Sequence, residues 1–165
     1  MDAPSPAQGG PGARASLELS RADIGFAAAH FSVVGGRAER LHGHNYRVAL
    51  RAHGDVAADG TVVDFGVLKS ALRAECDELD EHMLLPTSSE VVHVHAEGHV
   101  VTAEEGRRRF VFPAADVRLL AIPNTTCECL AAYLLSRLRA RLGATPVRLE
   151  VSVEEVPGQS ATVKE

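Results

Sequence analysis

Two histidines in the segment RLHGHNY, His42 and His44, are the residues whose types and spacing most clearly suggest chemistry. The segment has the pattern of a β-strand, and side chains at positions i and i+2 of a strand point to the same face. The two imidazoles can therefore converge on one ion. His30 ends the preceding strand candidate, and a hairpin-like return of the chain would bring it beside the pair. Three imidazole nitrogens with one open coordination position predict a catalytic Zn²⁺ site.

The competing interpretation of the pair is a solvated strand face. Gly43 favours the metal, because a glycine inside a strand often marks the close approach of a ligand or of another backbone. His93 and His95 repeat the spacing, but their alternation with Val92 and Val94 indicates a half-exposed strand. We therefore expect one metal site.

The composition excludes several functional classes. The 165-residue chain has a formal net charge of −5, which argues against a duplex nucleic-acid surface because such surfaces depend on Lys and Arg. No apolar run approaches the roughly 20 residues of a membrane helix, and no secretory signal begins the chain. We expect a cytoplasmic protein. Its three cysteines, Cys76, Cys127 and Cys129, are expected to be reduced thiols.

The chain is expected to form one domain over residues 16–165. Residues 1–15 are rich in Pro, Gly and Ala and predict a disordered leader. Alternating patterns predict antiparallel strands over 16–30 and 45–53, and a β-rich insertion over 90–120 that is broken by glycines. A further strand is expected within 147–156, followed by a short closing strand near 160–164.

Two helices are predicted from apolar residues at helical spacing. The first follows Asp64 as its N-cap, and its stripe comprises Val67, Leu68, Ala71, Leu72, Cys76 and Leu79. In the second, Leu130, Leu134, Leu138 and Leu142 recur before Gly143 as the stop signal. The expected fold class is α+β: an antiparallel sheet with two helices on one face and a β-hairpin insertion between the helices.

Six segments, in order, resemble the 6-pyruvoyl tetrahydropterin synthase and 6-carboxytetrahydropterin synthase family. They are FAAAH at 26–30, LHGHNY at 41–46, GTVVDFGVLK at 60–69, LDEHMLL at 79–85, NTTCECLA at 124–131 and VSVEEV at 151–156. The resemblance implies a T-fold subunit, a barrel-forming homohexamer and a reduced-pterin substrate near subunit interfaces. It also implies Zn²⁺ held by His30, His42 and His44.

The resemblance assigns substrate binding to Thr126, Glu128 and Glu155. A pterin ring presents adjacent N–H donors, and a carboxylate can accept two of them. Glu128 has an alternative, because Thr125 to Glu128 fits a helix capping box. Glu154 is the register alternative to Glu155, since a shift of one residue turns a strand side chain to the other face. For Asp64, plain helix capping is preferred.

The sequence departs from the family pattern where a catalytic cysteine is usual before His-Gly-His. No cysteine lies between Phe31 and Leu41, and Glu39 is the candidate general base instead. Its alternative is a solvent-facing charge beside Arg37 and Arg40. ERLHGH resembles a subset of the family in which glutamate replaces the cysteine.

A second departure lies in LDEHMLL, where the family usually places Asp-His together as a proton relay. Here Glu81 separates Asp80 from His82. Asp80 and His82 remain the expected acid/base residues, and the sequence leaves open whether a loop shift restores the relay or other carboxylates replace it.

The resemblance to that glutamate-containing subset implies a zinc-dependent lyase that cleaves the side chain of 7,8-dihydroneopterin, or of its phosphate, by a retro-aldol reaction to 6-hydroxymethyl-7,8-dihydropterin. The first alternative is 6-carboxy- or 6-pyruvoyl-tetrahydropterin synthase activity on the triphosphate. The second is a zinc- and pterin-binding protein without catalysis.

Overall fold

The computed structural model describes residues 11–165. Most of the leader expected at 1–15 therefore lies outside the described residues, and the first strand begins within its expected bounds, at Arg14. In chain order the elements are β1 (Arg14–His30), β2 (Val33–Val34), β3 (Arg37–Ala38), β4 (His42–Asp55), α1 (Phe65–Asp77), β5 (His82–Pro86), β6 (His93–Glu97), β7 (Val100–Glu105), β8 (Arg108–Pro113), a 3₁₀ turn (Ala114–Asp116), β9 (Val117–Leu120), α2 (Cys127–Leu142), β10 (Arg148–Val156) and β11 (Gln159–Lys164).

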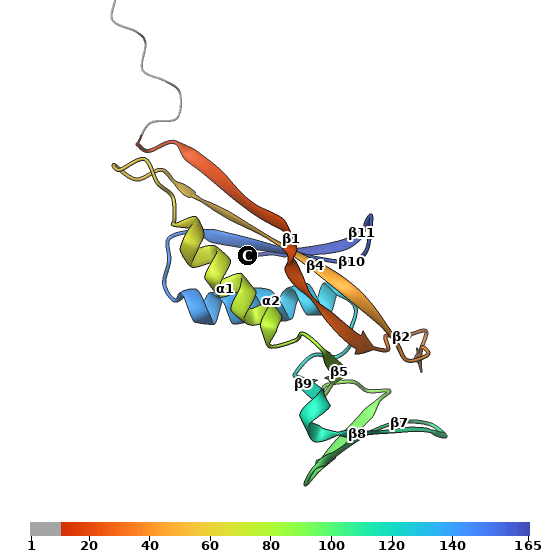
Figure 1. Ribbon diagram of the computed structural model, residues 1–165. Helices are drawn as coiled ribbons and strands as arrows, with labels where there is room; N and C mark the ends of the chain where they lie inside the picture. The colour runs from red at the N-terminus through yellow and green to blue at the C-terminus, as the bar shows by residue number, and fades with distance from the viewer. Residues whose placement is uncertain (1–10) are drawn as a thin grey trace, which may run out of the picture.

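The main sheet has six strands in the order β11-β10-β4-β1-β5-β9 (Figure 1). Its longest pair, β1 and β4, is antiparallel, and the register places His30 directly opposite His42. The hairpin-like return expected from the sequence is thus confirmed. The register of β1 shifts between Ser20 and Gly25. A Cβ at Gly25 would lie 2.0 Å from the Tyr46 carbonyl oxygen, so only glycine allows β4 this close.

The sheet is mixed, which corrects the expectation of an antiparallel sheet. β5 runs parallel to β1, and β9 runs parallel to β5. Because β5 consists of HMLLP with almost every side chain buried, its sequence is a short apolar run without the alternation that identifies half-exposed strands. Parallel neighbours require a crossover connection, and residues 87–116 supply it between β5 and β9.

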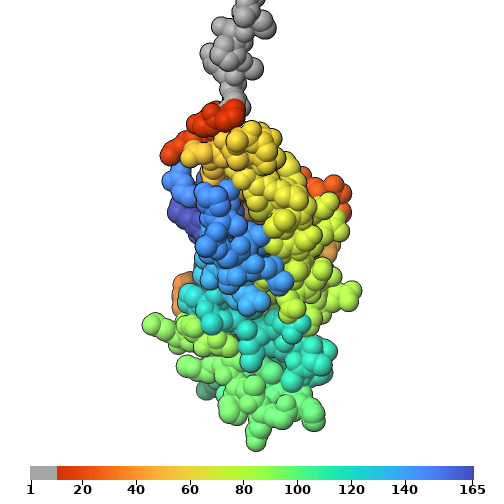
Figure 2. Space-filling model, turned by 90° about the vertical axis from the view of Figure 1, so that its left-hand side faces the viewer, coloured from red at the N-terminus to blue at the C-terminus, as the bar shows by residue number. Residues whose placement is uncertain are grey.

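The β-rich insertion forms as expected, with a shorter extent. Strands β6, β7 and β8 make a separate antiparallel sheet at the end of the molecule away from residue 11 (Figure 2, green to teal). Gly98 and Gly106 occupy the two hairpin turns with φ of 57° and 59°. The last part of the expected insertion, Val117–Leu120, belongs to the main sheet as β9.

Both helices cover the same face of the main sheet and enclose the principal core (Figure 1). The Asp64 carboxylate caps α1 by accepting a hydrogen bond of 2.6 Å from the Gly66 amide, and Gly143 ends α2 with φ of 66°. The predicted stripes are buried apart from Val67, which is 49% exposed, and Leu142, which is half-buried. Neither described helix combines the length and apolarity that crossing a membrane requires.

Candidate metal centre and adjoining pocket

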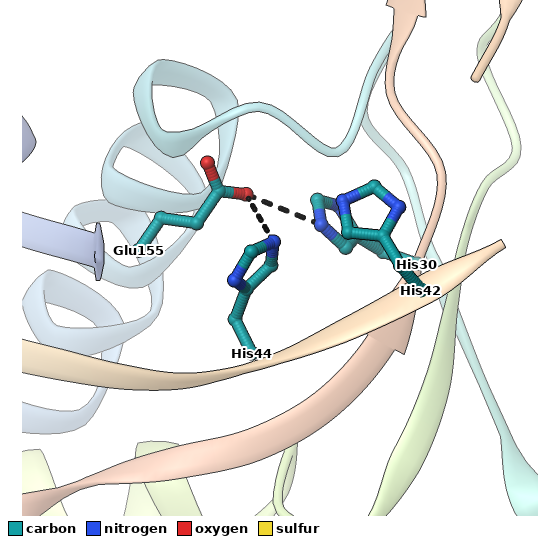
Figure 3. A group of neighbouring side chains, drawn as sticks. All are labelled: His30, His42, His44 and Glu155. Carbon is teal, nitrogen blue, oxygen red and sulfur yellow. Dashed lines mark ion pairs between the residues drawn. The ribbon is translucent and has the colours of Figure 1, made fainter. Parts of the chain in front are cut away.

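Four side chains from three strands converge at one end of the main sheet (Figure 3). His30 ends β1, His42 and His44 begin β4, and Glu155 lies near the end of β10. One donor atom from each lies within 4.8 Å of the others. His30 is fully buried, whereas the other three are open to solvent to some degree. The structure therefore brings together the three predicted metal ligands and one of the predicted substrate-binding residues.

Backbone carbonyls orient two of the three imidazoles. His30 Nδ1 lies 3.1 Å from the Thr125 carbonyl oxygen, and His42 Nδ1 lies 2.6 Å from that of Arg40. Because a carbonyl only accepts, each Nδ1 must carry the hydrogen, which leaves each Nε2 with a lone pair. Hydrogen bonds of this kind typically fix the tautomer and the ring orientation of metal-binding histidines.

Glu155 and Tyr46 complete the cluster. Glu155 Oε1 lies 3.2 Å from His30 Nε2 and 3.4 Å from His44 Nε2, and its other oxygen points away (Figure 3). The Tyr46 hydroxyl lies 3.0 Å from His30 Nε2 and donates to Glu155 Oε1 over 3.3 Å. Burial lowers the pKa of His30, against the opposing effect of Glu155, so a neutral imidazole is favoured.

This arrangement fits a divalent cation. The neutral His30 Nε2 and the carboxylate oxygen of Glu155 are both acceptors, and two acceptors 3.2 Å apart repel unless a proton or cation lies between them. Imidazole nitrogen and carboxylate oxygen are ligands that Zn²⁺ accepts in tetrahedral sites. His30, His42 and His44 could hold the ion, and Glu155 is within reach of the fourth position.

Gly43 has a different role from the one suggested by the sequence. It lies between the two histidines and, by strand alternation, on the opposite face. A Cβ there would lie 3.1 Å from the Ala28 carbonyl oxygen. The glycine thus marks the close approach of the β1 backbone and gives no independent support for a metal.

A hollow of about 300 Å³ adjoins the cluster and joins four of the predicted residues: Glu39, Thr126, Glu128 and Glu155. This volume is at the lower end of the range for small-molecule pockets, about 300–1,000 Å³. Glu155 belongs both to the hollow and to the histidine cluster. A molecule bound in the hollow would therefore have carboxylates around it and the candidate metal centre at one side.

The N-terminus of α2 borders this hollow and is capped by Thr126, whose hydroxyl accepts from the Cys129 amide at 3.5 Å. The alternative to a pterin-binding Glu128, a capping box from Thr125 to Glu128, is not formed: Thr125 is buried, and its hydroxyl donates to the Phe31 carbonyl at 2.9 Å. Glu128 is exposed, and hydrogen bonds from its own amide and from Thr126 lower its pKa. It is thus an ionised carboxylate beside the hollow.

The register of β10 distinguishes the two adjacent glutamates. Although the register with β11 shifts between Glu154 and Val156, Glu155 points to the histidines, with Oε1 3.2 Å from His30 Nε2. Glu154 accepts a hydrogen bond from the Gly158 amide at 2.8 Å and lines a hollow on the other face of the sheet. Glu155, the first choice of the two, is therefore the one at the cluster.

Asp80 and His82 lie outside the group of four converging donors. Asp80 Oδ1 accepts a hydrogen bond of 2.7 Å from the Ala27 amide, and His82 Nδ1 lies 2.5 Å from the Asp80 carbonyl oxygen. His82 instead lines a shallower hollow, together with His44. Between them Glu81 is exposed and has a left-handed backbone with φ of 57°. Within one subunit, Asp80 and His82 are not brought to the hollow that contains Glu39.

Sequence reasoning missed Tyr46, whose hydroxyl joins His30 to Glu155. The signal was available, because His42, His44 and Tyr46 are successive members of one period-2 face. Asn124 was also missed: its side chain accepts from the Val33 amide at 2.8 Å and donates to the Val33 carbonyl at 2.9 Å. Nothing in the sequence identifies that long-range contact.

Two curated relatives of known sequence are similar to this chain over most of its length. A curated relative from Methanocaldococcus jannaschii, named provisionally as a 6-carboxy-5,6,7,8-tetrahydropterin synthase, is 34% identical over 88% of this chain and 93% of its own. A relative from Pyrococcus horikoshii with the same provisional name is 29% identical over 77% of this chain and 76% of its own.

Solved structures agree. The 6-pyruvoyl tetrahydropterin synthase of Plasmodium vivax is 32% identical, with a TM-score of 0.88 over 93% of this chain and 98% of that chain. The Plasmodium falciparum enzyme is 31% identical, with a TM-score of 0.87 over 92% and 98%. Two further P. vivax structures replace a glutamate, described as a catalytic residue, by alanine and by cysteine.

The expected α+β T-fold is confirmed by these neighbours together with the two-helix, curled-sheet architecture. The family model for 6-pyruvoyl tetrahydropterin synthase matches residues 18–165, which is nearly the whole of the chain that the structure describes. The chain belongs to the 6-pyruvoyl tetrahydropterin synthase family.

Proposed function

We propose that the protein is a zinc-dependent lyase of the tetrahydropterin synthase type, which acts on the side chain of 7,8-dihydroneopterin triphosphate to form a 6-carboxy- or 6-pyruvoyl-tetrahydropterin. The names of its relatives favour this activity over the retro-aldol cleavage expected from the sequence. One observation supports this proposal above all: Glu155 contacts the histidine cluster and also lines the hollow that contains Glu39, so a substrate in the hollow would lie next to the candidate metal centre.

In this proposal the pterin ring binds between carboxylates of the hollow. Glu128 is exposed and ionised, and Glu155 has one oxygen directed away from the histidines (Figure 3). Each can accept N–H bonds from the ring, and charge-assisted hydrogen bonds of this kind are worth about 1.5–3 kcal/mol each. The Thr126 hydroxyl borders the same space.

The pterin side chain would then extend between the histidine cluster and Glu39. Zn²⁺ held by His30, His42 and His44 would act as a Lewis acid and lower the pKa of a side-chain hydroxyl. Glu39, which is exposed at the hollow, takes the proton as general base. Cys127, the one cysteine lining this hollow, is a poor base, because burial and the neighbouring glutamates raise its pKa to about 11.

Retro-aldol cleavage remains the second candidate, because no thiol lies between Phe31 and Leu41 and a carboxylate occupies position 39. Glu39 would take the proton of the C2′ hydroxyl, and the C1′–C2′ bond would break with its electron pair delocalised into the dihydropterin C=N system. C2′ would leave as the carbonyl carbon of a two-carbon aldehyde, and C1′ would then be protonated. The P. vivax protein is named a 6-pyruvoyl synthase although its catalytic residue is a glutamate, so a glutamate base does not exclude the synthase activity.

The test is identification of the product. Zinc-loaded protein is incubated separately with 7,8-dihydroneopterin and with its triphosphate. The pterin products are then separated by chromatography and identified by mass spectrometry. A 6-carboxy or 6-pyruvoyl product supports the proposal, whereas 6-hydroxymethyl-7,8-dihydropterin supports the second candidate. Tight pterin binding without any product would leave the non-catalytic alternative.

A further inference from the structure

Glu39 stands at the end of a hairpin that has little stability of its own. The hairpin consists of β2 and β3, which share two residue pairs, and its turn is Gly35-Gly36 with positive φ at both glycines. One backbone bond of 2.9 Å, from the Glu39 amide to the Ser32 carbonyl, closes it. Isolated two-stranded hairpins are marginal in water, so this segment needs external contacts to hold Glu39 in one place.

Two side chains of the β7–β8 hairpin supply such contacts. Arg108 donates from Nη1 to the Ala38 carbonyl at 2.6 Å and from Nη2 to the Glu39 carbonyl at 2.8 Å. Glu105 accepts from the Ala38 amide at 3.3 Å and pairs with Arg108 Nη1 at 3.2 Å. We call this pair of residues the Arg108–Glu105 clamp. It binds three backbone groups at and immediately before Glu39.

The clamp is itself held against the strand that carries His30. The Arg108 guanidinium lies 5.1 Å from the centroid of the Phe110 ring, and Phe110 stacks on Phe31 with 5.3 Å between centroids. Phe31 is 1% exposed and directly follows His30. The insertion sheet thus contacts both the metal-ligand strand and the Glu39 segment, and it fixes their relative position.

We propose that the β6–β8 insertion serves to position Glu39, with Arg108 as the positioning residue that acts through the backbone at 38–39. This inference rests on the proposed function of Glu39 as general base. The guanidinium is suited to the task because its planar fork serves two carbonyls at once, which a lysine ammonium cannot do with the same rigidity.

The first experiment compares Arg108→Ala, Arg108→Lys and the matched control Arg109→Ala in the zinc-loaded enzyme. Arg109 is the next residue of β8, is 66% exposed and pairs only with Glu104 among the described ion pairs. Arg108→Ala should lower kcat by about 10- to 100-fold while KM and bound zinc stay within about twofold, because small misplacements of a catalytic group are costly. Arg108→Lys should recover part of the loss, and Arg109→Ala should behave as wild type.

A double-mutant cycle separates positioning from general damage. If Arg108 acts through Glu39, then Arg108→Ala should cost almost nothing further in the Glu39→Gln background. A full, additive loss in that background would overturn the proposal. So would an Arg108→Ala enzyme with the kcat of Arg109→Ala.

The clamp can also be tested without substrate, so its failure is distinguishable from failure of the proposed function. Hydrogen exchange measured by mass spectrometry should show faster exchange in a peptide covering 33–41 in Arg108→Ala than in Arg109→Ala. The Ala38 and Glu39 carbonyls lose their donor, and Glu105, which accepts from the Ala38 amide, loses the ion pair that orients it. Equal exchange in both variants would contradict the clamp even if wild-type protein turns over pterin. Faster exchange in Arg108→Ala, together with no pterin turnover by the wild type, would support the positioning role of the clamp but contradict the proposed enzymatic function.

Discussion

Glu155 is the residue whose role decides whether the metal centre is open or closed. Its Oε1 lies within 3.4 Å of two candidate ligands, yet the residue also lines the hollow of Glu39. A fourth protein ligand would close the site and indicate a structural metal, whereas three histidines leave a position for substrate. The proposed function requires the second arrangement, with Glu155 as a pterin anchor.

Replacing Glu155 by glutamine should therefore leave zinc stoichiometry near that of wild type and weaken pterin binding at least about 10-fold, from the loss of one or two charge-assisted hydrogen bonds. Metal content after dialysis and pterin titration measure the two quantities. His44→Ala serves as the comparison and should lose zinc. Loss of zinc from Glu155→Gln to the same extent would identify Glu155 as a ligand.

At the scale of single residues, the sequence could predict what depends on local periodicity. His42 and His44 share a face because strands alternate, and the register that sets His30 opposite His42 follows from a simple antiparallel return. The contacts of Arg108 with the Glu39 segment could not be predicted, because they join residues 69 apart through a pairing that only the folded insertion creates. Asp80 and His82 were predicted from family resemblance alone, and the single subunit leaves them apart from Glu39.

The two helices are joined by a buried carboxylate. Glu75 of α1 is 2% exposed and lies 3.0 Å from Arg137 Nε and 2.6 Å from Arg141 Nε, both on α2. Both arginines remain partly exposed, so Glu75→Gln leaves them able to reach water. We expect a loss of about 1–3 kcal/mol in the free energy of unfolding, measured by urea denaturation.

Glu78→Gln is the matched control for that measurement. Glu78 caps the end of the same helix, but its side chain is 58% exposed and its pair with Arg118 spans 3.5 Å. Exposed pairs contribute about 0–1 kcal/mol, so this variant should be close to wild type. Equal effects of the two substitutions would show that the buried pair does not join the helices.

Cys76 on α1 makes stability depend on pH in the alkaline range. Burial, followed by the nearby Asp77, Glu75 and Asp80, raises its pKa to about 12. An unfolded thiol has a pKa of about 8.5, so between these values the unfolded chain releases a proton that the folded chain retains. The contribution of Cys76 to the free energy of unfolding is therefore fully present below pH ~8.5 and is lost as the pH rises.

The contribution of Cys76 should appear as a difference between wild type and Cys76→Ala. Urea unfolding at pH 8 and pH 10 should show wild type losing up to about 2 kcal/mol more than the variant between the two conditions, at 1.36 kcal/mol per pKa unit. An identical pH dependence in both proteins would contradict this assignment.

At the scale of elements, β1, β4, β10, β11 and both helices could be predicted because each has a face in water and a face in the core. The two parallel strands differ in this respect. β5 is buried along nearly its whole length, so its sequence lacks alternation, and β9 is a four-residue strand whose pairing depends on β5. The strand propensities and apolar patterns of such segments say little about whether they form strands, because the strands depend on tertiary contacts alone.

The whole subunit leaves the two edges of its main sheet, β11 and β9, without a strand partner among the described residues. Unpaired edges present backbone donors and acceptors that favour pairing with another chain. By family resemblance we expect a homohexamer, with a mass in solution about six times the chain mass of 17.5 kDa. Light scattering coupled to size-exclusion chromatography measures it. A mass near 17.5 kDa would contradict the expected hexamer.

In the proposed function, Glu39 performs proton transfer next to a zinc ion that the three histidines would hold. The most direct measurement is the turnover number of zinc-loaded wild type and Glu39→Gln on 7,8-dihydroneopterin triphosphate, with zinc content and pterin affinity determined on the same samples. General acid–base catalysis contributes about 10²–10⁴-fold, so the variant should lose activity by that factor while it retains zinc and pterin. A Glu39→Gln enzyme with the turnover number of wild type would contradict this role of Glu39.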